Sequence, residues 1–193
     1  MKKVLLNFIL EFKTQIRSIK KDGLKKQVPN MLTFSRAISP IIIIPTIILG
    51  RLDVAVVELI VFEITDFLDG RLARKYNCVS NFGVKLDAVC DKIFALGIMI
   101  PAIIKIPALF INLLLELGIG YVNIISESKN NHPKSNIIGK IKTAFLSITL
   151  VLVYIPGKLN KYVLISASFT LLLQIFALIK YRIDDINKDK KKK

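Results

Sequence analysis

The sequence predicts an all-α integral membrane protein in which six transmembrane helices follow an N-terminal amphipathic interfacial helix. Its 193 residues are 53% hydrophobic, and the mean hydropathy is +0.54, which is high for a soluble domain. The formal net charge is +15, yet residues 1–29 and 180–193 hold 15 of the 29 basic residues and only five acidic ones. Long apolar runs fill the middle. These features argue against a soluble, nucleic-acid-binding or disordered protein.

Residues 1–28 are expected to form an amphipathic helix that lies on an anionic membrane surface. Apolar residues recur there at helical spacing, and lysines and arginines lie between them. A targeting helix or an oligomer contact would show the same pattern. The apolar residues are Val4, Leu5, Phe8, Ile9, Phe12, Ile16 and Ile19.

Six apolar stretches then form the predicted transmembrane domain, residues 29–181, which precedes a basic cytoplasmic tail at 182–193. A helix needs roughly 20 residues to cross about 30 Å of hydrocarbon, and five of the stretches approach that length while the fifth in order is short. Both chain ends are expected in the cytoplasm, because the predicted outer loops hold only four of the 29 basic residues. The predicted spans lie near 31–50, 54–75, 82–104, 107–126, 142–157 and 161–180.

Four aspartates interrupt the second and third predicted spans, namely Asp66, Asp69, Asp87 and Asp91. An aspartate at the centre of a transmembrane helix costs ~2.5–3.5 kcal/mol on insertion, so such residues normally mark a functional site. The spacings of three and four residues put each pair on one helix face. A tight turn at 76–81 makes the two helices antiparallel neighbours. Both faces are therefore predicted to converge near the cytoplasmic leaflet.

The residues around these aspartates indicate the chemistry. Gly70, Ala73 and Gly83 lie on the same two faces and let a ligand approach the backbone closely. Carboxylate oxygens suit Mg²⁺ or Mn²⁺ rather than zinc, because His132 stands alone and no Cys/His cluster exists. Arg74 could pair with a carboxylate or with a phosphate. A metal, an arginine and carboxylates together are suited to displacing a phosphoryl leaving group.

The aspartates belong to a longer pattern, Asp66-x2-Asp69-Gly70-x2-Ala73-Arg74-x8-Gly83-x3-Asp87-x3-Asp91. It resembles the complete signature of the CDP-alcohol phosphatidyltransferases. The resemblance implies a six-span fold and transfer of a phosphatidyl group from CDP-diacylglycerol to an alcohol, with release of CMP. It also implies a general base, Asp91, and two divalent ions, Mg²⁺ or Mn²⁺. The implied metal ligands are Asp66, Asp69, Asp87 and Asp91, and the implied CDP-binding residues are Asp69, Gly70, Ala73, Arg74 and Gly83.

Two further segments resemble the phosphatidylglycerophosphate synthases within this family, whose acceptor alcohol is glycerol 3-phosphate. They read Pro29-Asn30-Met31-Leu32-Thr33-Phe34-Ser35-Arg36 and Gly139-Lys140-Ile141-Lys142-Thr143. By this resemblance Asn30 and Thr33 would face CDP. The acceptor phosphate would be held by Arg36, Lys140 and Lys142. Asn30 could instead begin a helix, and the three basic side chains could anchor the ends of spans.

One departure from the synthases leaves the acceptor open. They carry an Arg-Glu pair in the fourth span, whereas this chain reads Tyr121-Val122-Asn123 there. Phosphatidylglycerol, as in cardiolipin synthases, or an inositol-type polyol is the alternative acceptor. Glu63, one turn before Asp66, could be a protonated acid in the pocket floor or a contact of the acceptor.

Two other classes of protein are alternatives to the enzyme. An internal repeat would favour a carboxylate-lined cation transporter, but the sequence lacks one. The loss of an aspartate would favour a non-catalytic scaffold, but all four aspartates are present. The enzyme is expected in the plasma membrane of a bacterial cell, in contact with anionic lipid, with its active site on the cytoplasmic side. The resemblance implies a homodimer. Cys78 and Cys90 are predicted to stay reduced and only to pack.

Overall fold

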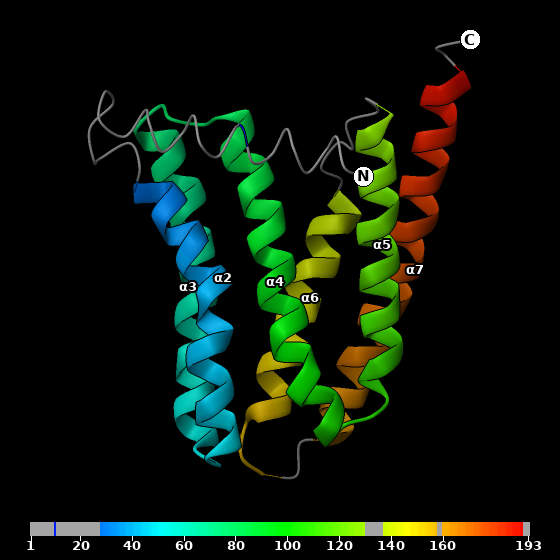
Figure 1. Cartoon of the computed structure of the whole chain (residues 1–193). Helices are drawn as coiled ribbons and strands as arrows, with labels where there is room; N and C mark the ends of the chain where they lie inside the picture. The colour runs from blue at the N-terminus through cyan, green and yellow to red at the C-terminus, as the bar shows by residue number, and fades with distance from the viewer. Residues whose placement is uncertain (1–9, 11–27, 130–136, 158–159, 191–193) are drawn as a thin grey trace. The chain divides into compact units, whose positions relative to one another are not determined.

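The computed structural model describes residue 10 and residues 28–129, 137–157 and 160–190, and the regular elements in these ranges are all α-helices (Figure 1). The all-α prediction is therefore confirmed for the described residues. The predicted amphipathic helix over residues 1–28 lies almost entirely outside them. The helices are α2 (Val28–Ile48), α3 (Leu52–Lys75), α4 (Asn81–Lys105), α5 (Leu109–Ser128), α6 (Ile137–Tyr154) and α7 (Asn160–Lys190).

Four of the described helices, α2, α5, α6 and α7, are long and apolar enough to cross a membrane. Large apolar side chains stay exposed on them, such as Ile41 in α2 and Phe176 in α7, as expected of surfaces that face lipid. Helices α3 and α4 are long enough as well, but they carry the predicted site aspartates and other charges. We therefore treat the chain as an integral membrane protein. That α3 and α4 also cross the membrane stays a prediction.

The contacts of the chain divide it into two compact units. The carboxylate unit contains α2, α3, α4 as far as Pro101, and Tyr154–Pro156. The C-terminal unit contains the described residues within 102–153 and 157–190, and with them α5, nearly all of α6, and α7. Helix α2 packs against α3 in the first unit, and α5 packs against α7 in the second.

A capped helix end positions the carboxylates on α3 and α4. Asn77 follows α3 with a φ of 50°, the left-handed conformation that asparagine tolerates better than most residues. The amides of Asn77 and Cys78 donate to the carbonyls of Arg74 and Ala73 at 3.2 and 3.0 Å, which is the Schellman pattern of helix termination. Helix α4 then starts at Asn81 and runs back in the opposite direction (Figure 1).

Helix α7 continues beyond the predicted end of the sixth span, so most of the predicted tail at 182–193 is helical. Asp185 on this extension is buried, although its side chain is polar. Lys129, just after α5, donates to Asp189 at 2.8 Å and to Asp185 at 3.1 Å, and these hydrogen bonds raise the pKa of Lys129. The extension is thus tied to α5 by its charged residues, which hydropathy alone does not reveal.

Gly97 allows α4 to approach α2 closely. A Cβ atom at Gly97 would lie 2.8 Å from both Cβ and Cγ of Pro40, and Pro40 is itself buried within α2. These two atoms belong to a rigid ring, so they cannot give way as the end of a flexible side chain would. The same glycine helps to keep α2 close to the carboxylate-bearing face of α4.

We expect Gly97→Ala to lower the midpoint of thermal unfolding in detergent. The added methyl group overpacks the contact, which costs about 1–3 kcal/mol, more than the roughly 1 kcal/mol that alanine gains over glycine in a helix. Gly118→Ala in α5 is the matched control, because a Cβ atom there meets nothing within 4 Å. The control should be neutral or stabilising. Equal midpoints for the two variants would contradict the close approach.

Candidate active site

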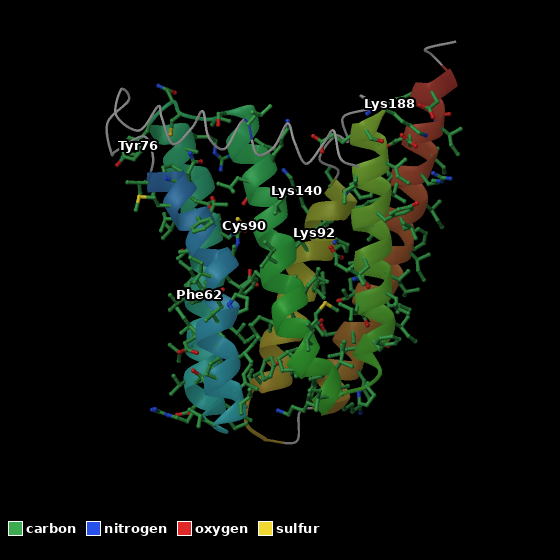
Figure 2. The ribbon with its side chains drawn as sticks, viewed as in Figure 1. Phe62, Tyr76, Cys90, Lys92, Lys140 and Lys188 are labelled. Carbon is green, nitrogen blue, oxygen red and sulfur yellow. The ribbon has the colours of Figure 1, made fainter. Side chains whose placement is uncertain are left out.

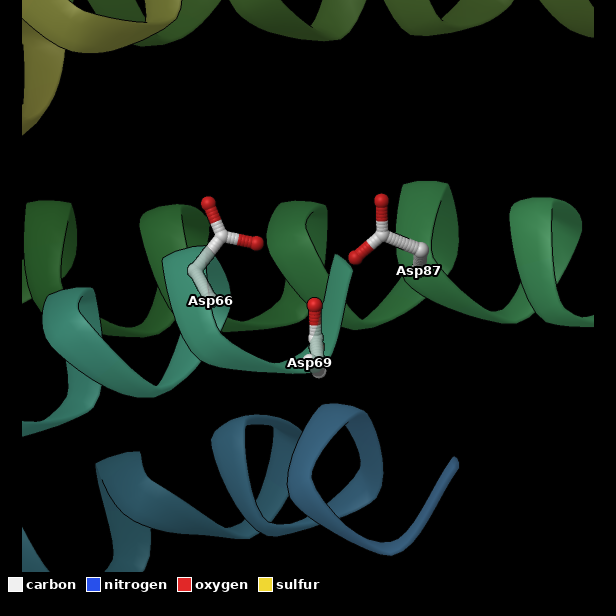
Figure 3. Close-up of side chains that lie close together, drawn as sticks. All are labelled: Asp66, Asp69 and Asp87. Carbon is white, nitrogen blue, oxygen red and sulfur yellow. The ribbon is translucent and has the colours of Figure 1, made fainter. Parts of the chain in front are cut away.

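Three aspartates from two helices form the centre of the candidate site. Asp66 and Asp69 come from α3 and Asp87 comes from α4, and one carboxylate oxygen of each lies within 4.8 Å of the others. Figure 3 shows their carboxylates facing a common space. Asp69 is buried, while Asp66 and Asp87 are partly exposed. The predicted convergence of the two helix faces is therefore confirmed.

The donor set of this cluster fits a hard divalent cation. It consists of carboxylate oxygens alone, which Mg²⁺ and Mn²⁺ prefer. The partial exposure of Asp66 and Asp87 also leaves room for the water ligands that Mg²⁺ usually keeps. Asp66, Asp69 and Asp87 are thus the described residues that could hold an ion together.

Arg36 is the buried cation of the cluster. It projects from α2, is 2% exposed, and its Nη2 atom donates to Asp87 Oδ1 at 2.8 Å. The guanidinium also forms ion pairs with Asp66 and Asp91. Asp91, one turn after Asp87 on α4, therefore joins the cluster through Arg36.

The role predicted for Arg36 as a ligand of the acceptor phosphate stays a prediction, and the contacts that the structure shows are with carboxylates. The sequence held a signal for them, because an arginine in an apolar span needs a counter-charge. The spacing of residues within one helix cannot show which other helix supplies it.

Thr33 orients Asp69, which is the most buried of the three clustered carboxylates. Its hydroxyl donates to Asp69 Oδ2 at 2.7 Å, and the carbonyl of Pro29 is an alternative acceptor at 3.0 Å. Thr33 lies one turn before Arg36 on α2, so one face of α2 meets two members of the cluster. The Thr33 hydroxyl, which the resemblance predicts to face CDP, thus donates a hydrogen bond to a carboxylate.

The small residues predicted to line the CDP site surround the turn between α3 and α4. A Cβ atom at Gly83 would lie 3.3 Å from the side-chain oxygen of Asn30 and 3.2 Å from that of Ser80, so an added side chain would press on both residues. Gly70 is open, with the Arg74 side chain 4.0 Å from its added Cβ atom. Arg74 itself is exposed and donates from Nε to the carbonyl of Gly70 at 3.0 Å.

Ala73 and Glu63 are half-buried on α3. Cys78 and Cys90 are both free cysteines. Cys90 is buried on α4 and packs with Leu86, and Figure 2 labels it together with Tyr76 at the end of α3.

A second buried charge pair lies in the C-terminal unit. Lys142 Nζ on α6 lies 2.8 and 2.6 Å from the two carboxylate oxygens of Glu116 on α5, and both side chains are about 6% exposed. Gln174 on α7 donates to the same carboxylate at 3.3 Å. The pair thus links three helices. Lys140, two residues earlier, is exposed and is labelled in Figure 2.

Sequence reasoning missed this network because Glu116 stands alone in its apolar span, with no spacing pattern around it. The only available signal was a rule of chemistry. An acid in one span and a lysine in the next can each lower the insertion cost of the other.

Comparison with known proteins gives a consistent result. Residues 26–179 match the family described as CDP-alcohol phosphatidyltransferase. A Rickettsia felis protein named CDP-diacylglycerol–glycerol-3-phosphate 3-phosphatidyltransferase is 33% identical over 145 residues, which cover 68% of this chain and 76% of the relative. Proteins of the same name from Rickettsia bellii and Aquifex aeolicus are 31% and 32% identical. Their matches cover 80% and 70% of this chain and 89% and 78% of the relatives.

We expect Lys142→Met to destabilise the protein strongly, because it leaves the Glu116 carboxylate buried without its counter-charge. Breaking a buried ion pair in this way costs about 3–5 kcal/mol, which should lower the thermal unfolding midpoint in detergent by many degrees. The double variant Glu116→Gln/Lys142→Met should recover most of the loss, since no uncompensated charge remains. Lys161→Met, at an exposed lysine of α7, is the control. A Lys142→Met midpoint equal to that of the control would refute the role of the pair.

Proposed function

The chain belongs to the CDP-alcohol phosphatidyltransferase family, and we propose that it transfers the phosphatidyl group of CDP-diacylglycerol to glycerol 3-phosphate and releases CMP. The observation that carries this proposal is the convergence of Asp66, Asp69 and Asp87 from two helices, at the positions of the family signature. Relatives named for this same reaction support the choice of acceptor.

Asp66, Asp69 and Asp87 would hold the divalent ions, Mg²⁺ or Mn²⁺. When bound, such ions neutralise the pyrophosphate and stabilise the departing CMP. Thr33 keeps the Asp69 carboxylate oriented by its hydrogen bond. The metal site thus has a supporting residue on a third helix, as metal ligands generally require.

Asp91 is the proposed general base. It lies one turn beyond Asp87 on α4, so its carboxylate is next to the metal ligands without being one of the three that converge. It accepts the proton of the acceptor hydroxyl while the hydroxyl oxygen attacks the phosphatidyl phosphorus. The bond from that phosphorus to the CMP oxygen breaks, and CMP carries away the negative charge.

Asn30, Gly70, Ala73, Arg74 and Gly83 would bind CDP. The open face at Gly70, where an added Cβ atom would meet only the Arg74 side chain at 4.0 Å, supports a site where a ligand approaches the backbone. Arg74 is exposed, so its guanidinium can pair with a phosphate without losing a buried partner.

The acceptor phosphate is assigned to Lys140 rather than to Lys142. Both lysines belong to the segment that resembles the synthases, but the ammonium group of Lys142 already lies against both oxygens of Glu116. Lys140 is exposed, and its charge remains available to a phosphate. We also propose that the enzyme acts in a bacterial membrane, with this chemistry on the cytoplasmic side.

We expect Asp91→Asn to reduce CMP release from CDP-diacylglycerol and glycerol 3-phosphate by about 100-fold or more, which is the usual contribution of a general base. The assay uses purified protein in detergent with Mn²⁺ or Mg²⁺. Asp53→Asn, an exposed aspartate in the first turn of α3, is the matched control and should keep full activity. Wild-type turnover by Asp91→Asn would exclude Asp91 as the base.

We expect Lys140→Met to raise the KM for glycerol 3-phosphate about tenfold or more, with little change in the KM for CDP-diacylglycerol. The reason is that the substitution removes a charge that meets the acceptor phosphate alone. The comparison is with Lys161→Met, which should leave both constants unchanged. If the KM for CDP-diacylglycerol rose instead, Lys140 would serve the donor substrate and not the acceptor.

A further inference from the structure

The guanidinium of Arg36 is shared by carboxylates that the proposed function gives to a metal. It contacts Asp66 and Asp87, two of the three residues able to hold an ion, and Asp91, the proposed base. Arg36 comes from α2, whereas all its partners lie on α3 and α4. The transfer chemistry described above gives this buried cation no task.

A divalent ion and the guanidinium would compete for the same oxygens. The contact of Arg36 with Asp87 uses Oδ1 at 2.8 Å, and its contact with Asp66 also uses Oδ1. Two cations that share carboxylate partners repel each other, and burial weakens the solvent screening between them. A bound metal therefore weakens the contacts of Arg36 with these carboxylates, and Arg36 in turn weakens the binding of the metal.

The carboxylates nevertheless need Arg36 when no ion is bound. Asp66, Asp69 and Asp87 offer oxygens within 4.8 Å of one another, so their negative charges repel at close range. Arg36 lies among them and is 2% exposed, which allows little help from water. Its charge compensates this repulsion across α2, α3 and α4.

The side chain also has a donor that the cluster does not use. The Nε atom of Arg36 is buried and has no hydrogen-bond partner among the described residues. A buried donor without a partner carries an energetic cost. Arg36 therefore leaves one of its donors unsatisfied in this position. This is expected of a side chain that a competing metal ion can displace.

We propose that Arg36 is an internal counter-ion that holds Asp66, Asp87 and Asp91 together before metal binds and competes with the metal for them. It lowers the affinity of the site for divalent ions and keeps the ion exchangeable. The proposal rests on the metal dependence in the proposed function, but it concerns binding of the ion and not transfer of the phosphatidyl group.

The test is a Mn²⁺ titration of the full chain in detergent, followed by electron paramagnetic resonance, without lipid substrate. Arg36→Gln should lower the Kd for Mn²⁺ about tenfold or more. Arg36→Lys keeps the charge and should stay within about threefold of the wild type. Arg51→Gln, the same change at an exposed arginine, should bind Mn²⁺ as the wild type does. An Arg36→Gln Kd equal to or above the wild-type value would overturn the proposal.

Thermal unfolding supplies an independent readout. Without metal, Arg36→Gln should unfold at a lower temperature than the wild type, and saturating Mn²⁺ should close most of that gap. A merely structural role would leave the gap unchanged by Mn²⁺, which contradicts the proposal. If Arg36→Gln does not fold even with Mn²⁺, the Mn²⁺ affinity of Arg36→Lys tests the proposal instead. A loss of Mn²⁺ affinity beyond tenfold in that variant would mean that the guanidinium supports the ion.

Failure of this proposal is distinguishable from failure of the proposed function. The titration needs no turnover, so tighter Mn²⁺ binding by Arg36→Gln stands even if CMP release is absent. Conversely, normal CMP release with an unchanged Mn²⁺ affinity in Arg36→Gln would remove the counter-ion role and leave the transfer reaction intact.

Discussion

Negative charge within apolar helices must be compensated, and this constraint shapes both units of the protein. In the carboxylate unit the aspartates of α3 and α4 gather around one arginine of α2. Three carboxylates facing one guanidinium leave negative charge to spare, and a divalent ion is the natural partner for the excess. The chemistry proposed for the enzyme thus follows from a charge imbalance that the helices hold in place.

In the C-terminal unit the same constraint is met by a balanced pair of charges, with no excess of negative charge. Glu116 and Lys142 neutralise each other within 2.6–2.8 Å, and Gln174 adds a hydrogen bond to the carboxylate. Such a balanced and buried pair joins α5, α6 and α7 but has no charge left for a phosphate. The contrast separates two lysines that the sequence motif treats alike, because only Lys140 remains exposed.

The sequence was sufficient for features that depend on local spacing. Apolar run length predicted the helices, and the spacing of Asp66, Asp69 and Asp87 predicted their convergence across a short turn. It was insufficient where a contact joins distant helices. Two partners of Arg36, Asp87 and Asp91, lie 51 and 55 residues away, and no periodicity within one helix encodes those contacts. The sequence did not predict the extension of α7 for a related reason. The charged residues that stabilise it are equally typical of a solvated tail.

The most direct test is identification of the lipid product. Purified protein in detergent would be incubated with CDP-diacylglycerol, glycerol 3-phosphate and Mn²⁺ or Mg²⁺, with and without EDTA, and the lipids analysed by mass spectrometry. The account predicts a lipid that carries both the phosphatidyl group and glycerol phosphate, formed in equal amount with CMP and absent with EDTA. Formation of phosphatidic acid alone, product formation in EDTA, or transfer only to another alcohol in an acceptor panel would contradict it.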